Sequence, residues 1–227
     1  MGRMTMVVLL AFFASFAMVS AADDGGPWAR VEAFFAKNKA EAAQAKGRFH
    51  LLPEETAGLE KVLSQCRQVV QKTVGDAKDL PFCAVWFSNF RSIGGFVVVT
   101  DGTIVACNDV PPILRSKENV KTAPADAKTA AHLQAAAQAT AAMQSRDWND
   151  CLIVHDGAIY FFCFNVPGTT AHSFIVPSPE DDDGDIAVEE VPGIITIPQD
   201  EVRLQLARLM KSLDETMKNA PLAKPLF

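Results

Sequence analysis

The sequence predicts an α+β fold in which helices flank a central antiparallel sheet of about five to six strands, and three observations support this. Four stretches carry apolar residues at helical spacing or have a high helix propensity. Short β-rich runs lie between them. Two of these runs, FVVVTDGTIVAC at 96–107 and CLIVHDGAIYFFC at 151–163, resemble each other and both turn on Asp-Gly. Neither hairpin can bury an apolar face alone, so we expect the two to share one sheet.

The first 22 residues are typical of an export signal. Arg3 precedes an uncharged apolar run at 7–19, and the small residues Ser20, Ala21 and Ala22 follow it. The run has the length of a signal-peptide core and is shorter than the roughly 20 residues that span a bilayer. An uncleaved membrane anchor is the alternative, because no charge interrupts the stretch up to Ala22. We therefore expect a secreted or periplasmic protein, with no membrane span once the signal is cleaved.

One domain of ordinary size is expected after the signal. The predicted units are the signal peptide at 1–22, an N-terminal helical extension at 23–50, the α+β domain at 51–219 and a tail at 220–227. Because 49% of the residues are hydrophobic, the chain can build a core without help from metals or disulfides.

The predicted helices lie at about 27–46, 53–74, 126–145 and 198–217. Pro27 suits the first turn of the first helix, and the second and fourth have a clear apolar stripe on one face. The third is almost wholly alanine, glutamine and threonine, so its propensity alone favours a helix. The fourth has acidic residues in its first turn and lysines near its end, as the helix dipole prefers.

The predicted strands form two groups, at 82–88, 96–100 and 103–107 and at 151–155, 158–164 and 172–176. The first group turns on Asp101-Gly102 and the second on Asp156-Gly157, the dipeptide most typical of a tight hairpin. Two copies of a helix followed by a hairpin would account for the recurrence. Independent use of the commonest hairpin turn is the alternative.

The charge of the chain argues against some classes of partner. The formal net charge is −6, and loss of Arg3 with the signal leaves −7. Lysines and arginines are scattered and form no basic stripe of the kind that neutralises phosphates. We therefore expect no nucleic-acid partner, and anionic membrane surfaces are poor candidates.

The order of elements, with GGFVVVTDGTIVAC in the first hairpin and LIVHDGAIYFF in the third and fourth strands, resembles the profilin-like roadblock family of dynein light chains and bacterial GTPase partners. The resemblance covers about residues 53–217. It implies a non-catalytic domain that forms dimers and serves as a platform for small GTPases and motor subunits. The export signal, the N-terminal helix, a strand at 82–88 and an acidic insertion at 179–192 depart from the family pattern. An exported protein does not meet cytosolic GTPases, so the resemblance supports the fold more than the partner.

The chain has five cysteines, and all lie beyond the signal. In an oxidising compartment their first meaning is disulfide bonding. A three-residue turn in the second hairpin would place Cys151 opposite Cys163, whereas a two-residue turn would place Phe162 there. We predict a disulfide between Cys151 and Cys163.

The other three cysteines have different expected roles. Cys66 lies on a predicted helix and is expected to be a free thiol. Cys83 and Cys107 are expected either to pair between neighbouring strands or to be buried. Since all five cysteines lie in apolar segments, burial as small hydrophobic residues is the alternative for the whole set.

The acidic run DDDGDIAVEE at 181–190 resembles part of a calcium loop. Asp181, Asp183 and Glu190 would take ligand positions, and these three are the candidate calcium ligands. The first ligand position would fall on Pro179, which has no ligating side chain, and neither flank is helical. A solvated loop is therefore the preferred interpretation, and we expect no bound metal.

Candidate catalytic residues are few. Cys151 and His155 would lie about 13 Å apart along a strand, which is too far for a direct hydrogen bond, and no known catalytic motif is present. We therefore predict no catalytic residue. His172 opens a strand beside the polar run 168–170, so it is the candidate ligand-binding residue, with a structural role as the alternative.

These observations predict an exported, non-enzymatic α+β protein that acts as a protein-interaction module, with another protein or a second copy in a homodimer as its partner. No cofactor is expected for that role. The alternative is an exported small-ligand binder of the haem type, because similar sheets occur in exported haem-binding proteins. A thiol-dependent enzyme is the third possibility.

Overall fold

The structure is a computed structural model, and it describes residues 26–44, 52–89, 92–110, 120–142, 158–177 and 200–222. The described residues form an antiparallel sheet flanked by helices, which confirms the predicted fold class. The helices are α1 (Gly26–Gln44), α2 (Pro53–Val74), α3 (Ala127–Thr140) and α4 (Asp200–Lys218). The strands are β1 (Phe82–Ser88), β2 (Ile93–Thr100), β3 (Thr103–Val110), β4 (Val120–Pro124), β5 (Ile159–Phe164) and β6 (His172–Pro177). Their order across the sheet is β4-β3-β2-β1-β5-β6.

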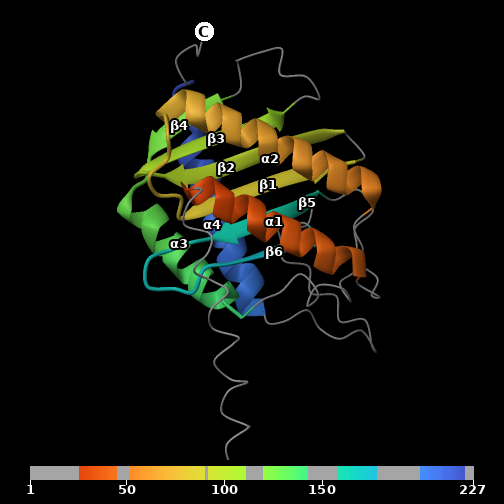
Figure 1. The fold of residues 1–227 in the computed structure, drawn as a ribbon. Helices are drawn as coiled ribbons and strands as arrows, with labels where there is room; N and C mark the ends of the chain where they lie inside the picture. The colour runs from red at the N-terminus through yellow and green to blue at the C-terminus, as the bar shows by residue number, and fades with distance from the viewer. Residues whose placement is uncertain are drawn as a thin grey trace, which may run out of the picture.

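The helices cover both faces of the sheet. In Figure 1, α1 and α2 cross the near face, while α3 and α4 lie behind it. Side chains alternate along each strand, so residues such as Val85 and Phe161 face α1 and α2, whereas Ala84 and Phe162 face the other pair. The sheet therefore separates two hydrophobic cores, one under each pair of helices.

The first predicted hairpin is confirmed between β2 and β3. Asp101 and Gly102 form its turn with φ angles of 46° and 74°, and this pair of positive angles is what a tight hairpin turn requires. The carboxylate of Asp101 also accepts hydrogen bonds from the backbone N–H groups of Lys78 and Asp79, each at 3.0 Å. The turn is thereby joined to the segment that leads into β1.

The second predicted hairpin is not confirmed, because β5 is paired with other strands on both of its edges. β5 pairs with β1 on one edge and with β6 on the other, from Ile159 to Phe164. Cys163 therefore has Cys83 and Ser173 as its neighbours in the sheet. Residues 151–157, which include Cys151, lie outside the described residues. The disulfide between Cys151 and Cys163 stays a prediction, but both edges of β5 are taken by other strands.

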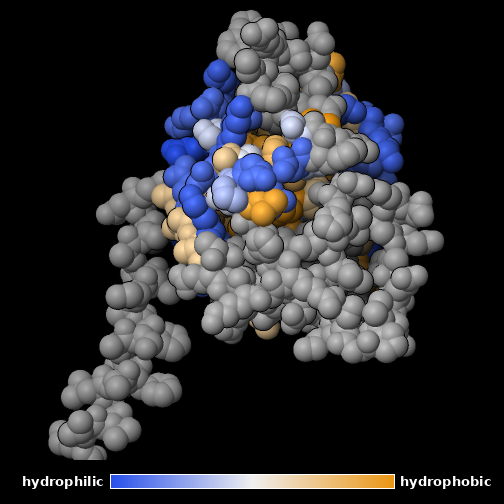
Figure 2. Space-filling view, turned by 90° about the vertical axis from the view of Figure 1, so that its right-hand side faces the viewer, coloured by the Kyte–Doolittle hydropathy of each residue, from blue (hydrophilic) through white to orange (hydrophobic). Residues whose placement is uncertain are grey.

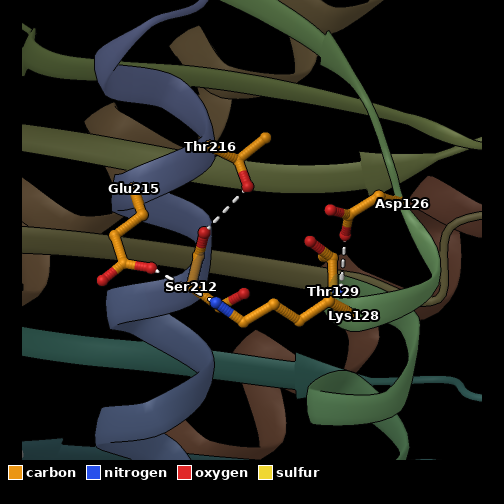
Figure 3. A network of polar contacts seen from close by, with 6 residues as sticks. All are labelled: Asp126, Lys128, Thr129, Ser212, Glu215 and Thr216. Carbon is orange, nitrogen blue, oxygen red and sulfur yellow. Dashed lines mark hydrogen bonds and ion pairs between the residues drawn. The ribbon is translucent and has the colours of Figure 1, made fainter.

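The α3/α4 face is closely packed because α3 has small side chains. Ala136, Ala137 and Thr140 are buried there, and α3 and α4 lie against each other. Asp126 begins α3 by accepting a 2.7 Å hydrogen bond from the backbone N–H of Thr129, a favourable arrangement at a helix N-terminus. Figure 3 shows this cap together with Lys128 of α3, which reaches across to Glu215 of α4 at 3.4 Å.

Several predictions fall on residues that the structure does not describe. These are the signal at 1–22, His155 and the candidate calcium ligands Asp181, Asp183 and Glu190. No helix among the described residues is both long and apolar enough to cross a membrane.

Candidate functional site

A groove between α1 and α2 is the candidate binding site. It has a volume of about 410 Å³. Its apolar part comes from Phe35 and Leu63, which are almost fully buried. Phe35 packs edge-on against Phe161 of β5, with ring centroids 5.2 Å apart, so the floor of the groove rests on the sheet. The polar part of the lining comes from Glu32, Glu60, Ser64, Arg67, Gln68 and Gln71.

Two ion pairs connect the helices across this groove. Arg67 bonds to Glu32 at 2.5 Å, and Lys39 bonds to Glu60 at 2.5 Å. The two pairs are seven residues apart on each helix, which is two helical turns or about 10.5 Å. The side chains are about half exposed, so each pair contributes little to stability. The paired side chains lie opposite each other because α1 and α2 run antiparallel, with Glu32 next to Arg67 and Lys39 next to Glu60.

The sequence contains a charge pattern that points to this pair of helices. In α1 an acidic residue precedes a basic one by seven positions, at Glu32 and Lys39, and α2 repeats the order at Glu60 and Arg67. Two antiparallel helices with this pattern place opposite charges against each other at both positions. What the sequence alone could not show is that the two helices lie on the same face of the sheet.

The groove suits binding better than chemistry. Its carboxylates, on Glu32 and Glu60, are each paired with a basic side chain, and no histidine or cysteine lines it. It therefore lacks a group poised to donate or accept a proton near neutral pH. An apolar floor with a charged rim is the arrangement that accepts an apolar side chain of a partner and hydrogen-bonds its surroundings.

Among the large apolar side chains of the described residues, only Leu52 and Leu222 are strongly exposed. Figure 2 views the molecule from the right-hand side of Figure 1, and there a small hydrophobic area lies among hydrophilic residues. The surface seen in this view is mostly polar where the structure describes it.

His172, the predicted ligand-binding residue, lies on the opposite face of the sheet. Its Nδ1 bonds to the carbonyl oxygen of Thr170 and its Nε2 to the hydroxyl of Thr140, both at 2.8 Å. The ring also stacks on Phe164, with centroids 5.1 Å apart. A role as haem ligand stays a prediction, and it would require one of these two hydrogen bonds to break.

The protonation of His172 follows from its surroundings. Burial lowers its pKa, and the carbonyl of Thr170 opposes this only in part, so the ring is neutral at pH 7. Because a carbonyl only accepts, Nδ1 carries the proton and Nε2 is an acceptor. The single hydrogen of the Thr140 hydroxyl is shared between Nε2 and the carbonyl of Ala136, which lies 2.7 Å away. This hydroxyl ties the end of α3 to β6.

The described cysteines lie together on the other face. Cys66, Cys83, Cys107 and Cys163 are all buried under α1 and α2, and none forms a disulfide with another. Cys83 and Cys163 are opposite each other, but the bond from Asn165 N–H to the Pro81 carbonyl makes theirs a hydrogen-bonded pair. In such pairs the side chains are farther apart than a disulfide prefers.

The thiols are also poorly suited to catalysis. Burial raises the pKa of Cys66, and the neighbouring Cys83 raises it further. Burial likewise raises the pKa of Cys163. Since the thiolate is the reactive form, both side chains are weak nucleophiles at neutral pH. Across the described ranges, no group of three or more His, Cys, Asp or Glu side chains is arranged to hold a metal ion.

Comparisons with protein-family models, with curated proteins and with solved structures found no match to this chain.

Proposed function

We propose that this chain is an exported, non-enzymatic interaction module that binds a partner protein in the groove between α1 and α2. The observation that carries the proposal is the groove itself, with its apolar floor of Phe35 and Leu63 and its two ion pairs. The sheet supports both helices from below, so the site is formed before a partner arrives. Preorganisation of this kind lowers the entropic cost of binding.

A photo-crosslinking residue in place of Ser64 tests the proposal. Ser64 is exposed and lines the groove, whereas Lys61 is exposed on the same helix but does not line it. In the native compartment, we expect the residue at 64 to capture one defined protein and the matched residue at 61 not to capture it. Equal capture from both positions would show that the groove is not the binding site.

A groove-filling substitution gives the second part of this test. Gln68→Trp places a large ring at an exposed position of the lining and should reduce capture from position 64 by about tenfold, equivalent to about 1.4 kcal/mol of binding free energy. Lys61→Trp is the matched control and should leave capture unchanged.

Export is tested separately, by cell fractionation and intact-mass measurement. We expect a mature protein that begins at Ala22 or Asp23 and is found outside the cytoplasm, because the small residues before these positions suit signal cleavage. A retained N-terminus in a membrane fraction would instead support the anchor.

A further inference from the structure

The outer edge of β4 is a second surface at which another chain can add. β4 pairs with β3 from Val120 to Pro124 along one edge, and its other edge is an outer edge of the sheet. In an antiparallel strand, successive residues direct their N–H and C=O groups to opposite edges. Thr122 donates to the outer side, so Val120 does too, while Pro124 has no N–H to donate.

The C-terminal segment lies against this edge. After α4, the chain turns with a bond from Ala220 N–H to the Met217 carbonyl at 3.2 Å. The Thr122 N–H then donates to the Pro221 carbonyl at 3.5 Å, and Lys121 and Leu222 form an antiparallel bridge. Pro221 and Leu222 therefore occupy the position that an additional strand would take beside β4.

Lys121 contacts the end of α4, next to the point where this segment leaves the helix. Its ammonium group donates to the carbonyl oxygens of Met217 and Lys218, at 2.9 and 3.2 Å. These carbonyls belong to the last turn of α4, where no later helical N–H groups follow. One side chain of β4 thus caps α4 beside the C-terminal segment.

The described part of this contact lies at the surface. The backbone bond from Thr122, at 3.5 Å, is longer than the 2.7–3.2 Å typical of N–H···O bonds, and Leu222 remains 56% exposed. An uncovered strand edge is a template for pairing with another chain. We propose that Pro221 and Leu222 close the β4 edge and so prevent a second copy of this chain from pairing there. This inference concerns a different surface from the groove and does not depend on the proposed function.

Truncation after Ala220 tests the proposal by analytical ultracentrifugation over a range of concentrations. The full chain should not pair at this edge and should have the mass of a monomer. The truncated chain should double its mass by pairing β4 with β4 of a second copy around a twofold axis. Thr122→Pro in the truncated chain removes an outward N–H while leaving the bonds to β3, so it should restore the monomer. A monomeric truncated chain, or a dimer that survives Thr122→Pro, would overturn the proposal.

A pair of cysteines in the full chain tests the closed edge without truncation. Lys121 and Leu222 are directly opposed, and the bond between Thr122 and Pro221 makes theirs a non-hydrogen-bonded pair, the arrangement that favours a disulfide. With oxidised glutathione, which takes up the two hydrogens, Lys121→Cys with Leu222→Cys should form an intrachain bond and lose about 2 Da. The control, Thr122→Cys with Leu222→Cys, is one position out of register and should not. Equal yields from the two pairs would overturn the proposal.

Discussion

The two faces of the sheet are covered by helix pairs that pack in different ways. On the α3/α4 face, small side chains of α3 let the two helices lie against each other above a layer of aromatic rings. On the α1/α2 face, each helix mainly contacts the sheet, above valines and cysteines, and ion pairs cross the groove between them. One face is a filled core, and the other keeps a hollow at its surface.

The aromatic layer shows how the filled face is organised. Trp86 of β1 stacks on Tyr160, and the stack continues along β5 through Phe162 and Phe164 to His172 of β6, with centroid distances of 5.1–6.4 Å. These rings pass from the middle of the sheet to its edge strand. This difference between the faces accords with the proposed function, in which the α3/α4 face supplies rigidity and the α1/α2 face presents the proposed binding groove.

Among the variants that test this comparison, Phe162→Ala should lower the stability of the chain most. Phe162 and its neighbour Phe161 are both fully buried, but the Phe162 ring meets four other rings and the Phe161 ring meets Phe35. Truncating a buried phenylalanine costs about 3–5 kcal/mol, and aromatic pairs add about 0.5–1.5 kcal/mol. In urea unfolding, we expect Phe162→Ala to lower stability more than Phe161→Ala. The reverse order would contradict the view that the aromatic face is the more tightly packed one.

Ala136→Leu should have the next largest effect. Ala136 lies on α3 and is fully buried in the core on the α3/α4 face. Extra methylene groups in a filled core cost about 1–3 kcal/mol. Ala131→Leu, at an exposed position of the same helix, is the matched control and should be nearly neutral. If thermal unfolding showed the two variants to be equally stable, the α3/α4 interface would have unfilled space.

The same comparison explains which elements could be predicted from the sequence. The helices and the Asp101-Gly102 hairpin depend on local patterns of spacing and turn chemistry, so they were recognisable. β4 was not, because VKTAP is short, has only one strongly apolar residue, and depends on pairing with β3 for its conformation. α3 ends at Thr140, earlier than the predicted 145, and the contact of the Thr140 hydroxyl with His172 joins two elements that no local pattern connects.

The order of the strands in the sheet is the main reason why the candidate site could not be predicted from the sequence. A hairpin signal shows which residues turn, but not which strands become neighbours, and β5 lies between β1 and β6. The groove likewise depends on α1 and α2 sharing one face, which no local pattern encodes. His172 was singled out from its position at a strand start beside the run 168–170, which supplies its partner Thr170, but its other partner, Thr140, comes from α3.

His172 should have a smaller effect on stability than these core substitutions, and the effect should depend on pH. Its pKa is lowered in the folded chain, whereas the unfolded chain keeps about 6.5. Above that value both states are neutral and His172 has no effect. As the pH falls below about 6.5, the unfolded state takes up the proton first, so stability should fall, by at most about 1.4 kcal/mol per pH unit.

Unfolding in urea between about pH 7 and pH 5 checks this direction. His172→Gln should flatten the pH dependence, whereas His132→Gln, on a partly exposed position of α3, should leave it unchanged. A chain that became more stable in this acid range would show that protonated His172 is favoured in the fold.

The smallest effect on stability is expected for the ion pair between Arg67 and Glu32, one of the two that cross the groove. Arg67 and Glu32 are about half exposed, as is Glu215 of the pair that links α3 to α4. Exposed pairs typically contribute about 0.2–1 kcal/mol, so a double-mutant cycle of Arg67→Gln and Glu32→Gln should give a coupling in that range, and 1 M salt should weaken it. The cycle of Lys128→Gln and Glu215→Gln is the matched control.

The two cycles should differ in their effect on binding rather than on stability. The ion pair between α3 and α4 lies beside a filled interface, whereas the pair of Arg67 and Glu32 lines the proposed binding groove. Arg67→Gln should therefore weaken capture from position 64 while Lys128→Gln leaves it unchanged. A coupling above about 2 kcal/mol between Arg67 and Glu32 would mean that the α1/α2 face depends on its charges for folding, and the division between a rigid face and a binding face would then be wrong.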